Sequence, residues 1–438
     1  MSPVETLPNQ RAAQAPPASG DVRFPNTSVP VVVLKAEDYG ALGIVRSLGR
    51  LGIRVYAIDA DSGAPALKSR YCAGKFIWNI DAAPAEQSVQ FLREVAGKIG
   101  GHPLLIPTGD LGSEFLAAHG QALRPAFRFP APPPGVVHSL YEKKRMYSLC
   151  KQFGIPTAET SFPQSRQDVM SFLDSATFPV VLKAIDPWRL QQRTGVRLVI
   201  VKDKGKLLES YDRMEDLEHP NLMLQEYIPG GEDSVWMFNG YFNEHSECLF
   251  GITGKKLRQF PAYTGMTSLG VCLKNEAVEK NAKDLMQAVG YRGILDIGLR
   301  YDARDGLYKI LDVNPRIGAT FRLFVATNGM DVARALYLDM TEQPVPPSRS
   351  IEGRKWFVED KDLISSLQYH RDGTLGFTQW ARSFRGVEEA AYFAWDDPLP
   401  SLRPARSLTR YLSRWLRNRK FQLRSVASRS SAGRQAGI

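Results

Sequence analysis

Short apolar runs alternate with helix-like stretches in the first third of the chain, and this alternation constrains the fold more than any other feature. The runs occupy residues 31–34, 54–59 and 104–107. Two glycines, Gly40 and Gly43, follow the first run as a turn and lead into apolar residues at helical spacing. Strands that alternate with helices form parallel sheets. We therefore predict a Rossmann-like parallel sheet within residues 29–135, with residues 108–110 at the carboxyl end of a strand, where ligands bind.

The glycine turn is a weak signal for a dinucleotide. It lacks the full G-x-G-x-x-G pattern, and Asp59 follows it closely at the end of the next strand. Our interpretation is a structural turn on a sheet without a dinucleotide, with an NAD or FAD site as the alternative.

The pattern changes after Tyr141. A helix is predicted over 143–153, and the strands that follow are typical of an α+β region with a mostly antiparallel sheet. Two of these strands, 293–301 and 308–313, are joined by Asp305 and Gly306, a pair that favours a hairpin turn. The predicted organisation is a disordered N-terminus at 1–28, a Rossmann-like domain at 29–135, a two-lobed domain at 136–345, a C-terminal extension at 346–400 and a basic tail at 401–438.

The excess of positive charge is confined to the basic tail. Residues 401–438 contain ten Lys and Arg and no acid, and removing these ten from the 56 basic residues leaves 46, equal to the 46 acidic ones. A neutral body argues against a specific nucleic-acid partner. Within the tail, residues 406–421 combine arginines with apolar residues at helical spacing. That pattern is typical of an amphipathic helix that docks on a membrane, on a partner protein or on the protein's own core.

The cysteines, the apolar runs and the N-terminal residues indicate the cellular compartment. The four cysteines lie far apart, without a C-x-x-C pair, which is typical of a reducing environment. No apolar run approaches the ~20 residues that span a bilayer, and the N-terminus lacks a secretory signal pattern. We expect a cytoplasmic protein, with membrane association through the tail and a homodimer as open alternatives.

Two lysines on separate elements are candidates for phosphate recognition. Lys143 begins the predicted helix, and Lys183 ends an apolar strand that directs its ammonium group to the end of a sheet. A lysine offers a phosphate a compact positive charge. Each alone also fits an ordinary surface lysine, so the pair matters only together with further motifs.

The next segment carries candidates for nucleoside recognition. It consists of Gln225, Glu226, Tyr227 and Ile228, followed by a two-glycine turn and Glu232. The strand edge would present backbone N–H and C=O groups to an adenine, and Glu232 would accept hydrogen bonds from two ribose hydroxyls. An ordinary strand end with solvated acids is the alternative.

Acidic side chains interrupt two apolar strands near the end of the two-lobed domain. Burying the Asp296 carboxylate without a cation is costly. On the second strand, alternation puts Asp312, Asn314 and Arg316 on one face, and Asp296 lies across from them if the strands pair through their turn. The oxygens of Asp296, Asp312 and Asn314 then suit Mg²⁺, with Mn²⁺ as an alternative. Arg316 offers donors to a phosphate or a carboxylate.

In order and spacing, these motifs resemble the ATP-grasp superfamily, and in particular its carboxylate–amine ligase branch, over residues 31–345. The resembling segments are Lys143 with Gly154-Ile155-Pro156, Pro179 to Lys183, Gln225 to Ile228 with Glu232, and Asp296 with Asp312, Asn314 and Arg316. The resemblance implies a Rossmann-like domain before a two-lobed ATP-grasp domain that binds ATP and Mg²⁺. It also implies that a basic residue in segment 255–261 neutralises the transferring phosphate, which points to Arg258 or Lys256.

One segment departs from the family. ATP-grasp proteins have a glycine-rich flap after the second lysine, whereas residues 187–195 contain one glycine and two arginines, Arg189 and Arg193. Three interpretations are open: the arginines hold phosphates, they clamp a substrate, or they mark lost catalysis.

The resemblance implies an ATP-dependent, ADP-forming ligase that joins a small carboxylic acid to a small amine through an acyl-phosphate. Its catalytic residues would be Arg316, Arg258 and Lys256. Two other functions stay open. One is an ATP-binding protein without ligase activity, suggested by the altered flap, and the other is an adaptor that acts through the basic tail.

Overall fold

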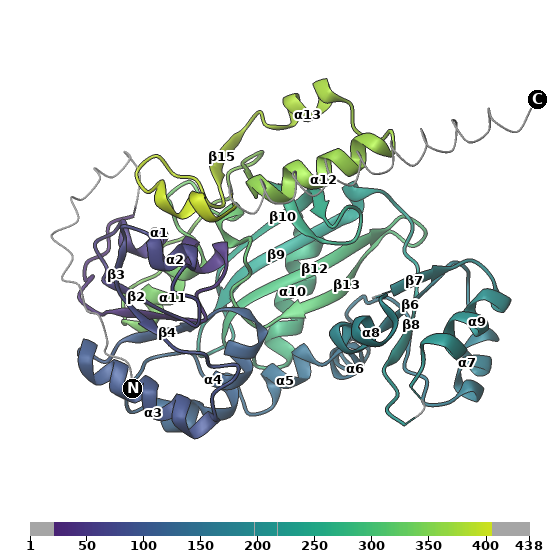
Figure 1. Ribbon diagram of the computed structural model, residues 1–438, viewed down its shortest axis with the longest axis horizontal. Coiled ribbons are helices and arrows are strands. Elements are labelled where there is room, and N and C mark those ends of the chain that lie inside the picture. Colours follow the sequence, from purple (N-terminus) through teal and green to yellow (C-terminus); the bar gives the residue numbers. More distant parts are fainter. Residues whose placement is uncertain (1–21, 197, 217, 405–438) are drawn as a thin grey trace, which may run out of the picture.

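The computed structural model describes residues 22–196, 198–216 and 218–404, and it shows a body from which a small lobe projects (Figure 1). One part of the body is a four-stranded sheet in the order β3-β2-β1-β4, with all strands parallel. The strands are β1 (Val31–Leu34), β2 (Val55–Asp59), β3 (Cys72–Ile77) and β4 (Leu104–Pro107), with helices α1 (Tyr39–Gly49), α2 (Pro65–Lys68), α3 (Ala85–Ile99) and α4 (Gly109–Leu123). This confirms the predicted parallel sheet.

A seven-stranded sheet in the order β13-β12-β9-β10-β11-β14-β15 lies beside the parallel one. Neighbouring strands are antiparallel, except that β14 and β15 are parallel. The strands are β9 (Val235–Phe242), β10 (Cys248–Phe260), β11 (Met266–Cys272), β12 (Gly293–Asp302), β13 (Leu307–Asn314), β14 (Lys355–Phe357) and β15 (Val387–Ala390). The helices of this region are α5 (Val136–Tyr141), α6 (Lys143–Gln152), α10 (Glu276–Ala288), α11 (Val332–Met340), α12 (Glu359–Arg371) and α13 (Phe377–Ser383). The predicted hairpin is present as β12 and β13, with the turn at Asp305 and Gly306.

The C-terminal segment, residues 346–404, contributes the last two strands of this sheet. β14 pairs with β11, and α12 packs on β10 and β11. Both α12 and α13 lie along one side of the sheet (Figure 1). Sequence analysis assigned no structure to the extension at 346–400, and the structure makes it part of the large sheet.

The small lobe is built on a second four-stranded sheet, in the order β5-β8-β6-β7, with antiparallel neighbours. Its strands are β5 (Thr160–Ser161), β6 (Val180–Ala184), β7 (Leu198–Val201) and β8 (Leu222–Glu226), and its helices are α7 (Arg166–Leu173), α8 (Pro187–Thr194) and α9 (Lys204–Met214). The lobe has its own apolar core, in which Leu182 and Leu224 from the sheet pack against Leu207 of α9. It therefore connects to the body mainly through the ends of its strands.

One continuous apolar core joins the two sheets of the body. Leu42 of α1, Met237 of β9 and Leu336 of α11 belong to the same buried cluster. Because this core crosses from one sheet to the other, the carboxyl end of the parallel sheet is held in place against the large sheet. No helix in the described part of the chain is long and apolar enough to cross a membrane.

The start of the described chain differs from the predicted disorder at 1–28. The ring of Phe24 stacks on Tyr337 of α11 with centroids 5.8 Å apart, and the N–H of Val22 donates to the carbonyl of Asn328 at 3.1 Å. Residues 22–28 are ordered because they cover apolar surface on α11. The rest of the predicted disordered N-terminus and the predicted helix at 406–421 lie outside the described residues.

Candidate functional site

Three charged side chains from the small lobe and the body come together at one point. α6 begins at Lys143, where the carboxylate of Glu142 caps the helix by accepting from the N–H of Lys144 at 3.0 Å. The ammonium of Lys143 forms an ion pair with Asp312 of β13. Burial, together with the charge of Lys143, lowers the pKa of Lys183 to about 8, and Asp312 opposes this shift. Lys143 thus pairs with the carboxylate, whereas Lys183 only lies near enough for the charges of both to act on it, and a phosphate would balance the two positive charges.

Two carboxylates and an amide share one face of the β12–β13 hairpin. The register pairs Asp296 with Asn314 and Gly298 with Asp312. Partners in an antiparallel pair point to the same face of a sheet. The amide of Asn314 also donates to Asp312 at 3.1 Å. The structure therefore brings together the three side chains that sequence analysis assigned to a metal ion.

The chemistry of this donor set fits a cation of the Mg²⁺ type. Burial raises the pKa of Asp296, and the positive charges of Arg316 and Lys256 only partly oppose that effect. Its carboxylate is also closely packed, since a Cβ added at Gly318 would lie 2.6 Å from its carboxyl carbon. Among the described residues no three His, Cys, Asp or Glu side chains form a metal cluster. Mg²⁺ needs only one or two protein carboxylates when phosphate and water complete its shell.

Arg316 connects this hairpin to the parallel sheet. Its guanidinium forms an ion pair with Asp110 in the first turn of α4 and donates to the amide oxygen of Asn314 at 3.3 Å. Thr108 also forms a β-bridge with Ile317. Residues 108–110, which sequence analysis expected near a ligand, therefore lie beside the candidate metal residues.

A cavity of about 660 Å³ opens next to Arg316. It lies between α4, the proline-rich residues 130–134 and the start of β12, and its walls are mainly apolar. Lys143, Lys183 and Asp312 are not among its lining residues. The cavity is therefore adjacent to the charged site and distinct from it.

The end of β8 connects the small lobe to the body. The side chain of Gln225 donates to Thr160 at 2.9 Å, and the backbone N–H groups of Glu226 and Tyr227 donate to neighbouring segments. Within the described part of the chain, the N–H of Ile228 has no hydrogen-bond partner. Of the four predicted hinge residues, Ile228 thus offers a free backbone donor to an adenine.

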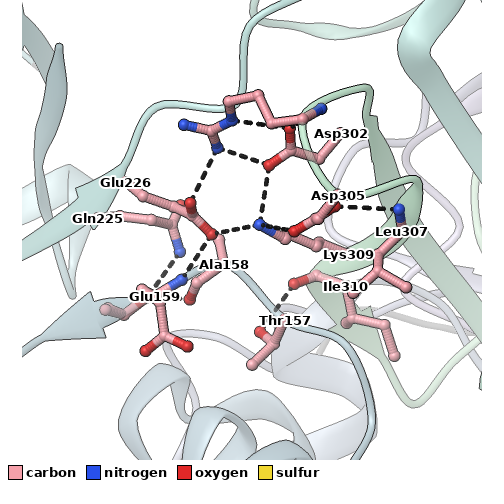
Figure 2. Close-up of polar contacts among 12 residues, drawn as sticks. Thr157, Ala158, Glu159, Gln225, Glu226, Asp302, Asp305, Leu307, Lys309 and Ile310 are labelled. Carbon is pink, nitrogen blue, oxygen red and sulfur yellow. Dashed lines mark hydrogen bonds and ion pairs between the residues drawn. The ribbon is translucent and has the colours of Figure 1, made fainter. Parts of the chain in front are cut away.

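The carboxylate of Glu226 has a structural role. Figure 2 shows it pointing toward the ammonium of Lys309, at 2.9 Å, and it also pairs with Arg304 at 2.9 Å. Lys309 in turn contacts the fully buried Asp302 at 2.8 Å. These contacts occupy the side chain of Glu226, and its backbone N–H donates to the carbonyl of Glu159 at 2.8 Å. Glu232 lies further along, at the start of a short 3₁₀ helix, η1 (Glu232–Ser234).

Lys256 faces the candidate metal residues. Asn239 of β9 pairs with Asp296 of β12 on one side and with Ile252 of β10 on the other, so these three side chains share one face of the sheet. Lys256 lies four residues after Ile252 on β10, and alternation along the strand brings it to the same face. Burial lowers the pKa of Lys256, and the carboxylates of the candidate metal site act in the opposite direction. The ammonium donates to the carbonyl of Gly265 at 3.1 Å.

Arg258 lies elsewhere, and its contacts do not support its predicted catalytic role. A bulge in β10 makes Leu269 its partner, whereas Lys256 pairs with Gly270, so the two basic side chains point to opposite faces. The guanidinium of Arg258 is buried and donates to both carboxylate oxygens of Asp362 in α12, at 2.8 and 2.9 Å. Arg258 therefore anchors α12, on the face opposite to that of Lys256.

The arginines of the expected flap also have structural partners. The segment forms α8, and Arg189 pairs with Asp216 at 2.7 Å. Arg193 donates to the carbonyl of Met214 at the end of α9. Because both arginines turn toward α9, these contacts do not support the interpretation that they hold phosphates.

Two residues near Lys256, Tyr39 and Lys361, belong to none of the sequence motifs. Tyr39 lies in the first turn of α1, and Lys361 lies in the first turn of α12. Tyr39 directly precedes Gly40, which lies inside α1 together with Gly43 and not in the turn that the sequence predicted. The two glycines are a signal that could have drawn attention to Tyr39. The sequence around Lys361 contains no comparable signal.

The parallel sheet, the small lobe and the large sheet, with charged residues between them, have the arrangement of the ATP-grasp fold, and the chain is similar to carboxylate–amine ligases of that fold. No protein-family model matches it. In sequence it is similar to the D-aspartate ligase of Enterococcus faecium (strain Aus0004), with 24% identity over 360 residues, which cover 78% of this chain and 85% of that protein.

Solved structures share the fold at lower identity. The biotin carboxylase domain of the Hydrogenobacter thermophilus 2-oxoglutarate carboxylase, solved with MgADP, ADP and bicarbonate, aligns with a TM-score of 0.55 and 17% identity over 75% of this chain and 73% of that one. The L-amino acid ligase of Bacillus licheniformis aligns with a TM-score of 0.54 and 15% identity over 75% of this chain and 79% of that one.

Proposed function

We propose that this chain is an ATP-dependent, ADP-forming ligase that joins a carboxylate to an amine through an acyl-phosphate. The observation that carries the proposal is the meeting of Lys143 and Lys183 with the oxygen donors of the β12–β13 hairpin. Two ammonium groups, two carboxylates and an amide at one point suit a triphosphate with its divalent cation. The resemblance to the E. faecium D-aspartate ligase over most of both chains supports the same reaction class.

In the first step, a carboxylate oxygen of the acid attacks the γ-phosphorus of ATP, the bond to the β-phosphate oxygen breaks, and ADP leaves. Phosphoryl transfer depends mainly on positioning and charge stabilisation. Lys143 and Lys183 supply positive charge to the phosphates, and Lys256 lies on the face from which the acid would approach. Mg²⁺, held by Asp296, Asp312 and Asn314, would supply further charge neutralisation.

In the second step, the amine attacks the acyl carbon, the C–O bond to the phosphate breaks, and inorganic phosphate and a proton leave. Arg316 is positioned for this step because Asn314 and Asp110 hold its guanidinium between the two sheets. A fixed guanidinium can stabilise the negative charge that develops on the acyl oxygen. The backbone of Ile228, together with Glu232, would bind the adenosine.

The names of the relatives point to amino acids as substrates. One relative is a D-aspartate ligase, and one structural neighbour is an L-amino acid ligase. The experiment is a phosphate-release screen of the full-length chain with Mg-ATP and pairs of amino acids and small carboxylic acids, with mass spectrometry of the products. We expect ADP formation that requires both substrates, together with an amide product. ATP binding without any amide product would instead favour a nucleotide-binding protein without ligase activity.

A further inference from the structure

Three polar groups from distant parts of the chain meet at the start of β11. The ammonium of Lys256 donates to the carbonyl of Gly265 at 3.1 Å. The ammonium of Lys361 and the hydroxyl of Tyr39 both contact the sulfur of Met266, each at 3.2 Å. Lys361 also lies over the Tyr39 ring, 4.6 Å from its centroid. These three side chains of β10, α12 and α1 are called the lysine–tyrosine group below.

Neither ammonium in this group has a carboxylate partner among the described residues. A thioether is a weak acceptor, and a single carbonyl leaves further donors of an ammonium group unused. Burial lowers the pKa of Lys361, and Asp360 and Asp38 oppose that shift only in part. Partly buried cations of this kind are stabilised by an anion. Met266, which contacts two members of the group, is 48% exposed, whereas the two lysines are partly exposed and Tyr39 is buried.

The surrounding structure fixes the group in place. A Cβ added at Gly265 would lie 2.0 Å from the carbonyl carbon of Phe260, so only glycine allows the tight approach that places its carbonyl at Lys256. α12 is held by the buried contact between Arg258 and Asp362, the residue next to Lys361. Arg258 is therefore a positioning residue for Lys361.

The group also lies beside the candidate reaction centre. Lys256 is on the face of the large sheet that carries Asp296, and the charge of Asp296 acts on both Lys256 and Tyr39. An anion bound here would therefore lie near the acid that is activated, without being the carboxylate that receives the phosphoryl group.

We propose that Lys256, Lys361 and Tyr39 bind a substrate carboxylate that does not react. This inference rests on the ligase function proposed above and defines its substrate class. Either the amine substrate is an amino acid with a free carboxylate, or the acid substrate is a dicarboxylate of which only one group is activated. In both cases the C-terminal segment, through Lys361, selects the substrate.

The first test is steady-state kinetics of the full-length chain with Lys361→Met, which keeps the aliphatic stem and removes the charge. We expect the KM of the substrate that carries the spectator carboxylate to rise about 10- to 100-fold, because a charge-assisted hydrogen bond is lost. The KM of ATP should stay within about twofold of the parent value, and Lys361→Arg should restore much of the affinity. Lys98→Met, on the exposed surface of α3, is the matched control.

The substrate whose KM changes identifies the source of the carboxylate. A change for the amine substrate indicates a free amino acid, and a change for the acid indicates a dicarboxylate. An analogue in which that carboxylate is converted to an amide should bind the parent chain weakly. Its affinity for the Lys361→Met variant should be no lower. Equal weakening of ATP binding, or unchanged KM values for all substrates, would overturn the proposal.

A binding measurement separates this proposal from the ligase function. Thermal unfolding of the full-length chain is followed with a panel of D- and L-amino acids and dicarboxylates and with their amides, in the absence of turnover. We expect stabilisation by carboxylates that is absent in Lys361→Met and unchanged in Lys98→Met. If the parent chain forms no amide but this carboxylate effect is present, the ligase function is wrong and the anion site stands. If no carboxylate stabilises the parent chain, the anion site is wrong.

Discussion

Lys183 carries a charge that the folded chain does not neutralise. Lys143 has Asp312 as a partner, whereas Lys183 forms no ion pair with any described residue, and its pKa is lowered to about 8 by burial first and by Lys143 second. A group of this kind costs stability in the absence of a ligand. Removing the Lys183 ammonium should therefore weaken ATP binding without lowering the free energy of unfolding of the unliganded chain.

The first prediction concerns Lys183→Met. ATP binding should weaken about 10- to 100-fold, because one charge-assisted contact is worth ~1.5–3 kcal/mol. The free energy of unfolding should stay the same or rise, because a poorly solvated charge is removed. Calorimetric titration and urea unfolding measure the two effects, with Lys206→Met on the exposed side of α9 as control. A loss of stability together with unchanged ATP affinity would remove Lys183 from the site.

The second prediction concerns Asp312→Asn, which keeps the shape of the side chain. Turnover should fall at least about 100-fold, because the metal ion and its bound phosphates lose a charged ligand that is worth several kcal/mol. The rate should also respond less to the concentration of Mg²⁺. Asp284→Asn is the control, since Asp284 pairs with Lys280 on the surface of α10. Near-normal turnover at saturating Mg²⁺ would show that Asp312 is not a ligand.

At the scale of elements, the β12–β13 hairpin links the candidate site to the small lobe. One end of the hairpin carries Asp296 and Asn314, and the other end carries Asp302 and Lys309. Lys309 contacts both Asp302 and Glu226 at the end of β8 (Figure 2). Burial disfavours the ammonium of Lys309, but its three acidic partners outweigh this and raise its pKa. The same element therefore positions the metal ligands and one strand end of the nucleotide-binding lobe.

The third prediction concerns this link. Lys309→Met leaves the buried Asp302 with Arg304 as its remaining cation, and breaking a buried pair costs about 3 kcal/mol. We expect a loss of that size in urea unfolding and a raised KM for ATP, because the end of β8 loses its anchor. Lys280→Met, whose side chain is 72% exposed in a surface pair, should lose less than about 0.5 kcal/mol. Equal losses in both variants would contradict the proposed role of the cluster.

The hairpin is the element that the sequence predicts best, because apolar alternation, the Asp-Gly turn and the polar residues on one face all indicate the same structure. Arg258 could not be placed in this way. It follows Lys256 by two residues, which implies the same face, and the sequence does not reveal the bulge that turns it toward α12. Lys361 has no sequence signal at all, since its neighbours Tyr39 and Met266 are distant in the chain.

At the scale of the whole molecule, the C-terminal segment closes the body by binding back to the parallel sheet. Arg46 of α1 pairs with Asp397, and Arg50, the residue after this helix, pairs with Asp396, each at 2.9 Å. The first of these pairs is almost fully buried. Glu389 of β15 joins the segment to Arg322, and within the segment it pairs with Arg354. These ion pairs tie residues near both ends of the described chain to the large sheet.

The fourth prediction is a loss of stability in acid that depends on this closure. Burial alone would raise the pKa of Glu389, but Arg322 and Arg354 lower it to about 2, below an unfolded value of about 4.3. A lowered pKa stabilises the folded state above the unfolded pKa, and this contribution is lost as pH falls from about 5 toward 2. Urea unfolding between pH 3 and pH 7 should show this slope. Glu389→Gln should be less stable at pH 7 and show a smaller slope, whereas an unchanged slope would exclude Glu389 as its source.

The meeting of Tyr39 and Lys361 has a consequence for how the protein is made. A ribosome releases the strands and lysines that would hold ATP well before it releases α12. A growing chain therefore contains every residue proposed to hold ATP before Lys361, the residue proposed to select the substrate, is synthesised. A chain that ended before α12 would keep the first set of residues and lack the second.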